Sequence, residues 1–342
     1  MTWLDIVSRI LKPFATLLLA PGSVMSLYSL TVAFAIGFVF LAFRQKRRRG
    51  RVRLKAVGHA ILAPQIVFHR STLADLCYLL FGLLSLGFLL GWAVLSASTI
   101  SDLVEAFLRN HLGAHAPLEA PEFVLGVGST VLLFLAYELG FFLDHTLKHR
   151  IPALWELHKT HHSAEVLTPL TNFRVHPLDS LILTNNLALV IGLIAGLAKY
   201  AIGKPVEMIE FDGKNILMIL YIYLAAQLQH SQFWIPLTGA LGRLFMSPAH
   251  HQIHHSCDPV HFNRNLGASL AIWDWLFGSL EIPQKEPPRL TFGVAELGRD
   301  PHSITGLVVD PVINALSALL GVKLPLPPVS AEHGKEQPAP RS

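Results

Sequence analysis

The sequence has little charge and little cysteine. Only 15% of its 342 residues are charged, whereas a soluble domain carries roughly 25%. Hydrophobic residues make up 52%, and the mean hydropathy is +0.47. This composition excludes an ordinary soluble globular protein and predicts an integral membrane protein. The two cysteines, Cys77 and Cys257, are too few for a disulfide framework.

Two kinds of motif are also missing. No G-x-G-x-x-G fingerprint opens a helix, so the sequence indicates no built-in flavin or nicotinamide site. Residues 1–20 lack a compact basic region followed by a cleavage site, which argues against a cleaved signal peptide. Arg9, Lys12 and Pro13 interrupt this stretch, and we expect an interfacial amphipathic helix there.

Long apolar runs are present instead. Three of them, 25–43, 77–97 and 123–143, are near the roughly 20 residues that a bilayer-spanning helix needs. Two more, 181–202 and 215–229, are short or interrupted by polar residues. We expect this pair to pack on the other helices as a hairpin. Whether it crosses the bilayer fully stays open.

A basic loop follows the first apolar run and sets the expected orientation. It contains Arg44, Lys46, Arg47, Arg48, Arg49, Arg51, Arg53 and Lys55. The positive-inside rule predicts that this loop is cytoplasmic and meets anionic lipid. Counting onward, the loop 98–122 is outside, and residues 145–174 return to the cytoplasmic side. His230 and residues 250–255 arrive on that side as well.

Eight of the 18 histidines are concentrated in three short runs. They are His145, His149, His158, His161, His162, His251, His254 and His255. Spacings of three and four residues place the imidazoles of each run on one helix face. Pro152 is expected to end the first helix, and Ser247-Pro248 suits the start of the third. His250 breaks the register and is expected to point away.

Imidazoles this close together repel one another when protonated, and a metal is the usual reason for keeping them neutral. Eight ligands are too many for one ion, so the runs predict a two-metal site. Imidazole suits iron, zinc and copper, so ligand type alone does not choose the metal. Cys257, two residues after the last run, is an alternative soft ligand that an all-imidazole set does not need.

The order of the motifs resembles a known family. H-x-x-x-H, H-x-x-H-H and a distant H-x-x-H-H lie within roughly residues 124–283. They are accompanied by R-x-H-P-L-D at 174–179 and by H-F-N-R-N-L-G followed by W-D-W-L-F-G within 261–278. This pattern is similar to the fatty acid hydroxylase/sterol desaturase superfamily, whose members bind two irons and use O2 to oxidise a lipid C–H bond. The resemblance implies ten ligands: His145, His149, His158, His161, His162, His176, His230, His251, His254 and His255.

The fold expected from these observations is all-α. Four to five transmembrane helices would be capped by a cytoplasmic helical domain that carries the histidine-rich di-metal site. We expect an N-terminal membrane region at 1–122, a catalytic domain at 123–283 and a C-terminal extension at 284–342. Within that extension, 303–324 should form a peripheral apolar helix, and the tail from Pro325 reads as disordered.

Other residues and partners follow from the expected chemistry. Metal-bound imidazoles usually donate their second N–H to a carboxylate or a carbonyl, and Asp179 and Asp274 are candidates. Asn265 and Arg174 are expected to brace the site or orient substrate. The substrate would be a lipid from the bilayer, and a ferredoxin, a cytochrome b5-like protein or a reductase would supply electrons. The basic loop favours a bacterial inner membrane, and no nucleic-acid partner is expected.

Two alternatives remain at this stage. A non-redox metal hydrolase could use the same ligands to activate water, but such sites normally include carboxylate ligands. A membrane metal-binding protein or metal transporter would place polar ligands within the spans. The histidine runs lie beyond the apolar runs, so the sequence favours a lipid hydroxylase or desaturase. The motifs do not distinguish these two reactions.

Overall fold

The computed structural model describes residues 3–85, 91–294, 300–303 and 305–322. This part of the chain is mainly helical. Its only sheet pairs two-residue strands, β1 (Glu210–Phe211) and β2 (Lys214–Asn215), which run antiparallel. The expected all-α fold is therefore confirmed.

Three described helices are long and apolar enough to cross a bilayer. They are α2 (Leu27–Arg49), α7 (Glu122–Arg150) and α9 (Pro177–Ile202). A fourth candidate is a broken span, in which the segment Leu54–Val67 meets α5 (Arg70–Ser85) at a bend of 79°. The described chain thus offers three or four spans, against the four to five expected.

The shorter elements connect these helices. They are α1 (Trp3–Leu19), α3 (Leu54–Ile61), α4 (Pro64–Val67), α6 (Ala97–Leu112), α8 (Pro152–His162), α10 (Ile216–Tyr221), a π-helical turn (Ile222–Ala226), α11 (Gln227–Gln229), α12 (Gly239–Leu244), α13 (Pro248–His254), α14 (Ile272–Phe277), a second π-helical turn (Thr305–Val309) and α15 (Asp310–Leu320). Single 3-10 turns occur at Gly91–Ala93, Pro169–Phe173 and Pro259–His261.

The prediction of one continuous span over 77–97 is wrong. Helix α5 is described up to Ser85, Gly91–Ala93 form a 3-10 turn, and α6 begins at Ala97 and continues into the expected loop 98–122. The Ser96 side chain caps α6 by accepting a hydrogen bond from the Thr99 N–H at 3.2 Å. Hydropathy measures only apolar content, so it does not detect a helix start of this kind.

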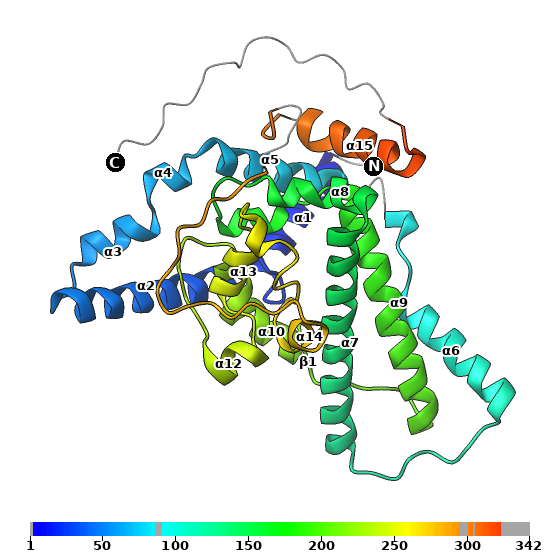
Figure 1. Cartoon of the computed structure of the whole chain (residues 1–342). Coiled ribbons are helices and arrows are strands. Elements are labelled where there is room, and N and C mark those ends of the chain that lie inside the picture. Colours follow the sequence, from blue (N-terminus) through cyan, green and yellow to red (C-terminus); the bar gives the residue numbers. More distant parts are fainter. Residues whose placement is uncertain (1–2, 86–90, 295–299, 304, 323–342) are drawn as a thin grey trace.

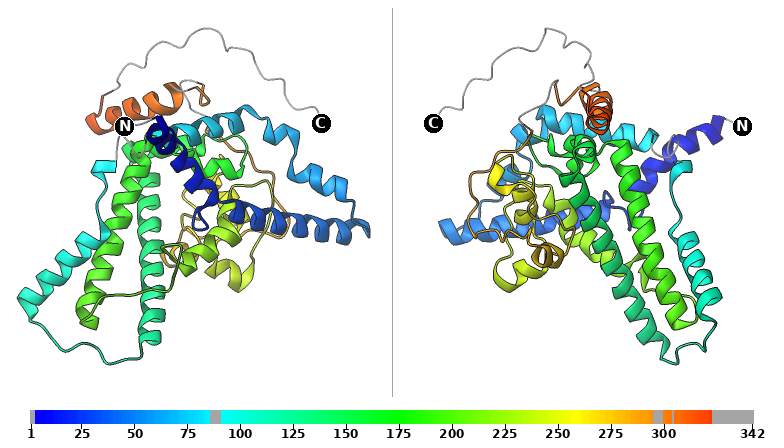
Figure 2. Two further views of the ribbon diagram at one scale, coloured as in Figure 1. Left: turned by 180° about the vertical axis from the view of Figure 1, so that it is seen from behind. Right: turned by 45° about the vertical axis from the view of Figure 1, so that its right-hand side comes forward.

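Helices α7 and α9 run antiparallel side by side, and α6 packs along α9 (Figures 1 and 2). Two glycines one turn apart on α9 allow the close approach. A Cβ atom at Gly196 would lie 2.6 Å from Val104 Cβ, and one at Gly192 would lie 2.7 Å from Ile100 Cβ. Small residues at this spacing let the backbones of membrane helices meet.

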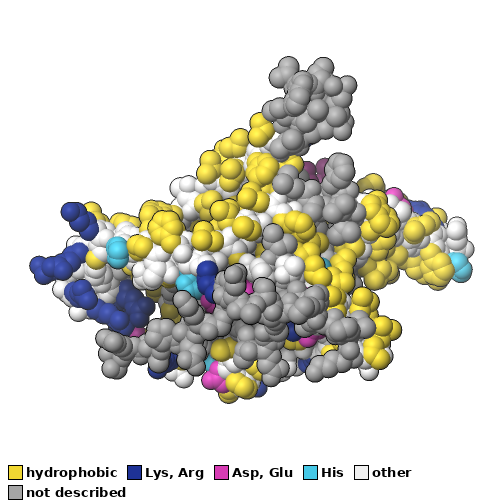
Figure 3. Space-filling model, turned by 90° about the horizontal axis from the view of Figure 1, so that it is seen from above, with side chains coloured by type: hydrophobic (Ala, Val, Ile, Leu, Met, Phe, Trp, Pro, Cys, Tyr) yellow, Lys and Arg dark blue, Asp and Glu magenta, His cyan; other side chains and the backbone are white. Residues whose placement is uncertain are grey.

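The axis of helix α2 is steeply inclined to those of α7 and α9 and does not run parallel to them (Figures 1 and 2). Its far end and the start of α3 form a basic prong, defined here as residues 46–55. Figure 3 shows Lys and Arg side chains gathered at this edge of the molecule, where the prong's seven cations are exposed: Lys46, Arg47, Arg48, Arg49, Arg51, Arg53 and Lys55.

Helix α8 folds back from the end of α7. Ile151 separates the two helices, and Pro152 occupies the first turn of α8, as expected for a residue that cannot continue a helix. Helix α15 packs on α8, so the apolar segment expected at 303–324 does form a peripheral helix (Figure 1). The tail from Pro325 lies outside the described residues.

The contact between α6 and α9 can be tested with matched glycine substitutions. Gly196→Leu should destabilise the protein by about 1–3 kcal/mol, because the added side chain has no space against Val104. Gly126→Leu on α7 is the control, since a Cβ there meets no atom within 4 Å. Thermal unfolding of both variants in detergent is the measurement. Equal midpoints for the two would contradict this packing.

Candidate metal centre

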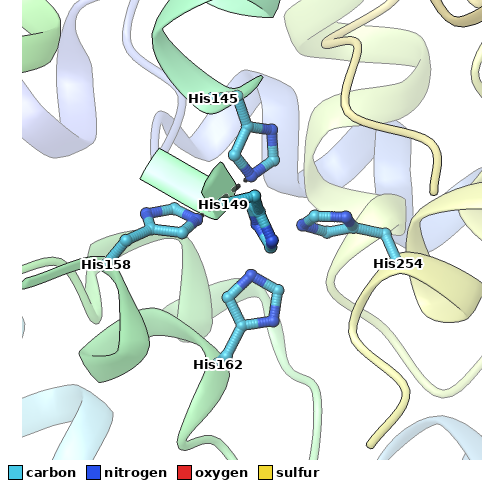
Figure 4. A group of neighbouring side chains, drawn as sticks. All are labelled: His145, His149, His158, His162 and His254. Atoms are coloured by element: carbon cyan, nitrogen blue, oxygen red, sulfur yellow. Dashed lines mark hydrogen bonds between the residues drawn. The ribbon is translucent and has the colours of Figure 1, made fainter. Parts of the chain in front are cut away.

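Nine buried or half-buried histidines meet where α7, α8, α11 and α13 come together. They form two groups, and within each the ligand nitrogens all lie within 4.8 Å of one another. The five-histidine group is His145, His149, His158, His162 and His254, whose rings point toward a common centre in Figure 4. The four-histidine group is His161, His230, His251 and His255.

The two H-x-x-H-H runs contribute to both groups in opposite ways. In the 158–162 run, the first and last histidines join the five-histidine group and His161 joins the other. In the 251–255 run, the first and last join the four-histidine group and His254 joins the other. Residue i+4 is displaced by about 40° around a helix and residue i+3 by about 60° the opposite way. One run can therefore serve two neighbouring centres.

The nitrogen spacing fits metal coordination. In the four-histidine group, His230 Nε2 lies 2.9 Å from His251 Nε2, 3.1 Å from His255 Nε2 and 3.2 Å from His161 Nε2. Two nitrogens bound to one ion at about 2.1 Å lie about 2.9–3.4 Å apart for angles near 90–109°. These separations are those of a coordination shell.

The five-histidine group also has closely spaced ring nitrogens. His145 Nε2 and His158 Nε2 are 3.1 Å apart. The Nε2 atoms of His149, His162 and His254 are buried and have no hydrogen-bond partner among the described residues. Lone pairs left in this way are suited to a metal ion. The two groups adjoin, since the His162 and His255 rings stack with centroids 4.6 Å apart.

Burial favours the neutral form at several of these positions. It lowers the pKa of His254 to about 3, and burial together with repulsion from His254 does the same for His230. Burial and mutual repulsion also hold the pKa values of His161 and His255 well below the usual range. A neutral imidazole has a lone pair to offer, which is the form that binds a metal.

Backbone carbonyls orient two members of the five-histidine group. His145 Nδ1 donates to Leu266 O at 2.8 Å, and His254 Nδ1 donates to Arg264 O at 2.9 Å. A carbonyl can only accept, so each Nδ1 carries the proton and each Nε2 is free for a metal. The sequence analysis did not anticipate these partners, because no side-chain pattern marks a backbone carbonyl.

Asp179 orients a third ligand, as expected. Its Oδ2 accepts a hydrogen bond from His158 Nδ1 at 3.0 Å. Lys148 pairs with Asp179 Oδ1 and lies 2.6 Å from Asp144 Oδ2. All three charged side chains are buried, so Lys148 compensates two carboxylates beside the site. Its place between two histidines of an apolar helix was the available signal for this role.

Asp274 acts differently from the expectation, whereas Asn265 has a bracing role, one of its two expected roles. Asp274 accepts hydrogen bonds from Leu266 N at 2.8 Å and Gly267 N at 2.7 Å, so it holds the backbone rather than an imidazole. The Asn265 side chain bonds Glu281 N and O. Both residues brace the loop that carries the orienting carbonyls.

His176 does not join either group, which corrects its expected place among the ligands. It caps α9, where its Nδ1 accepts from Leu178 N at 3.2 Å and its Nε2 donates to Val308 O at 3.0 Å. Both ring nitrogens are thus used. His250 also points away from the groups, as expected, and its Nε2 donates to Gly242 O at 3.0 Å.

Arg174 braces the site through the backbone of α8. Its fully buried guanidinium donates to Thr160 O at 3.1 Å, near the end of α8, and to Asp75 Oδ1 at 2.9 Å. It also donates to Pro301 O at 2.8 Å. One side chain therefore ties α5 and the C-terminal segment to the helix that carries three of the histidines.

A cavity of about 290 Å³ adjoins the histidines. The Trp155 ring forms part of its wall and lies 5.1 Å from the His149 ring and 5.3 Å from the His162 ring, centroid to centroid. The other lining residues are His254, His255, Ser256, Cys257, Phe262, Asn263, Gly293 and Val294. The cavity gives a small molecule a route to both groups.

Asp179→Asn should weaken metal binding about 10–100-fold, because it removes the carboxylate that orients His158. Asp102→Asn is the control, since Asp102 pairs with Lys199 at the surface. Competition with a chelator measures the affinity. An unchanged affinity in the Asp179 variant would show that this carboxylate does not support the ligand.

Comparison with known proteins agrees with the geometry. Residues 130–279 match the fatty acid hydroxylase family. Over 155 residues, the chain is 30% identical to ornithine lipid hydroxylase OlsE of Rhizobium tropici, covering 45% of this chain and 42% of that protein. Over 161 residues, it is 29% identical to alkylglycerol monooxygenase of Homo sapiens, covering 45% and 31%.

Cholesterol 25-hydroxylase of Homo sapiens is 27% identical over 168 residues, which are 48% of this chain and 55% of that protein. The chain thus spans less than two thirds of the length of each of these relatives. No solved structure matches it. The matched segment contains the nine grouped histidines, so the similarity to the fatty acid hydroxylase family extends over the candidate metal centre.

Proposed function

We propose that this protein is a membrane-bound di-iron oxygenase that hydroxylates or desaturates a C–H bond of a lipid. The observation that carries this proposal is the pair of adjoining groups of buried neutral histidines. The five-histidine group would hold one iron and the four-histidine group the other. Two reducible ions would supply the O2 chemistry that no side chain can perform.

The ligand type favours redox chemistry over hydrolysis. Both groups consist of imidazoles, and among the described residues Asp179 faces the Nδ1 side of His158, away from the shared centre. A hydrolytic site normally includes carboxylate ligands. The named relatives are two hydroxylases and a monooxygenase, which supports the same choice.

The position of the groups argues against a transporter. They lie where the ends of α7 and α11 meet α8 and α13, beyond the apolar middle of the candidate spans. A transport pathway would place its polar ligands within the spans.

The size of the cavity favours a lipid substrate of which only a part enters. Its volume of about 290 Å³ is at the lower limit of the 300–1,000 Å³ that is typical of small-molecule pockets. Trp155 and Phe262 provide apolar walls, while His254 and His255 bring the ligands to its surface. We infer that the reacting part of a lipid occupies the cavity and that the rest lies outside it.

The electrons come from a separate protein in this proposal, a ferredoxin, a cytochrome b5-like protein or a reductase. We place the basic prong and the histidine groups on the cytoplasmic side of a bacterial inner membrane. The prong supports this orientation, because seven exposed cations directly follow an apolar helix.

Metal analysis tests the proposed centre. Purified protein should contain two irons per chain, and His254→Ala should lower this content, because His254 is a member of the five-histidine group. His111→Ala removes an exposed imidazole of α6 and should leave the iron content unchanged. Active protein that is filled with zinc would overturn the redox assignment.

Filling the cavity should block lipid oxidation without removing the metal. Cys257→Trp places an indole in the cavity wall, whereas Cys77→Trp replaces an exposed cysteine on α5 and is the control. Lipid extracts of expressing cells grown under isotopically labelled O2 would be compared by mass spectrometry. A gain of one labelled oxygen indicates hydroxylation, and a loss of two hydrogens indicates desaturation. Wild-type product levels from the Cys257 variant would exclude this cavity as the substrate route.

A further inference from the structure

A short irregular segment presents both orienting carbonyls. We define residues 264–270 as the strap. Arg264 O accepts from His254 Nδ1, and Leu266 O accepts from His145 Nδ1. Both imidazoles belong to the five-histidine group. The position of the strap therefore determines where two of the five Nε2 atoms point.

Glu138 holds the other end of the strap. Its carboxylate accepts hydrogen bonds from Leu270 N at 2.9 Å, from Ser269 N at 3.1 Å and from Ser269 Oγ at 2.5 Å. The residue is fully buried on α7. All three facing groups are donors, so an acceptor-only carboxylate suits this position.

The arrangement makes α7 a two-point clamp. Glu138 and His145 are seven residues apart, so two helical turns place them on the same face of α7. His145 binds the strap at Leu266, and Glu138 binds it at Ser269 and Leu270. The spacing of these two contacts along a rigid helix sets the position of the strap.

The middle of the strap is also secured. Gln229 Nε2 donates to Ala268 O at 2.8 Å, and Asp274 accepts from Gly267 N at 2.7 Å. Placing an ionisable residue within a membrane span costs free energy, so such a residue usually serves a function. Glu138 belongs to none of the histidine runs and is not a member of either metal-ligating group.

We propose that Glu138 is a positioning residue for the five-histidine group and acts on His145 and His254 through the strap. This inference rests on the metal site of the proposed function. Its distinguishing consequence is selectivity, because both strap carbonyls that accept from an imidazole orient members of one group. Loss of Glu138 should weaken one metal site and spare the other.

Cobalt(II) titration of the metal-free full-length protein tests this selectivity. Glu138→Gln places amide donors against the donors of the strap. It should reduce cobalt affinity of the five-histidine site about 10-fold or more and change its visible spectrum, with the four-histidine site unchanged. Reference variants assign the two binding phases: His149→Ala for the first site and His251→Ala for the second.

A matched control separates positioning from general stability. Thr130→Val removes another buried polar group of α7. The Thr130 hydroxyl accepts a hydrogen bond from Ile209 N at 2.8 Å. This variant should lower thermal stability without changing either cobalt site. Ser269→Ala removes one of the three hydrogen bonds to Glu138 and should produce a smaller selective loss. If the Glu138 variant does not fold, the Ser269 variant still tests the proposal.

The outcomes are distinguishable from a failure of the proposed function. If wild-type protein binds no metal, the metal centre itself is wrong. If wild-type protein binds two ions and the Glu138 and Ser269 variants weaken both sites equally, or neither, the positioning role is wrong and the metal centre stands.

Discussion

The rest of this structure depends on keeping nine imidazoles close together and away from water. Each ring must offer one nitrogen to a shared centre, and the geometry of the other nitrogen decides how firmly the ring is held. The two H-x-x-H-H runs meet this constraint by serving both centres at once. Their one-turn spacing brings the His162 and His255 rings into contact, so the two groups adjoin.

Support for the ligands comes from distant parts of the chain. Asp179 lies on α9, and the strap precedes α14, whereas the rings that they orient lie on α7, α8 and α13. A carbonyl orients an imidazole without bringing another charge to the site. Among the described residues, a carboxylate orients a grouped imidazole at His158, and there the buried Lys148 compensates it.

Two buried charged residues connect distant segments of this apolar protein. Arg174 pairs with Asp75 and also reaches the backbone of α8 and of the segment near Pro301. Glu138 joins the middle of α7 to the strap. Removing one partner would leave the other buried and uncompensated, so these contacts hold the helices in one arrangement.

The sequence by itself determined the fold class, most of the grouped histidines and the local helix starts. The i, i+4 pair His145 and His149, the break at Pro152 and the start at Ser247-Pro248 are all properties of neighbouring residues. Local patterns specify which side chains share a helix face, because helical periodicity is a short-range property.

Only the tertiary structure decided where those faces meet. It divided each H-x-x-H-H run between two groups, placed His176 at a helix cap and showed that 77–97 is not one span. It also brought Glu138 to the strap, more than a hundred residues away in the chain. Such contacts depend on how helices pack across long loops, and no spacing within a single helix encodes them.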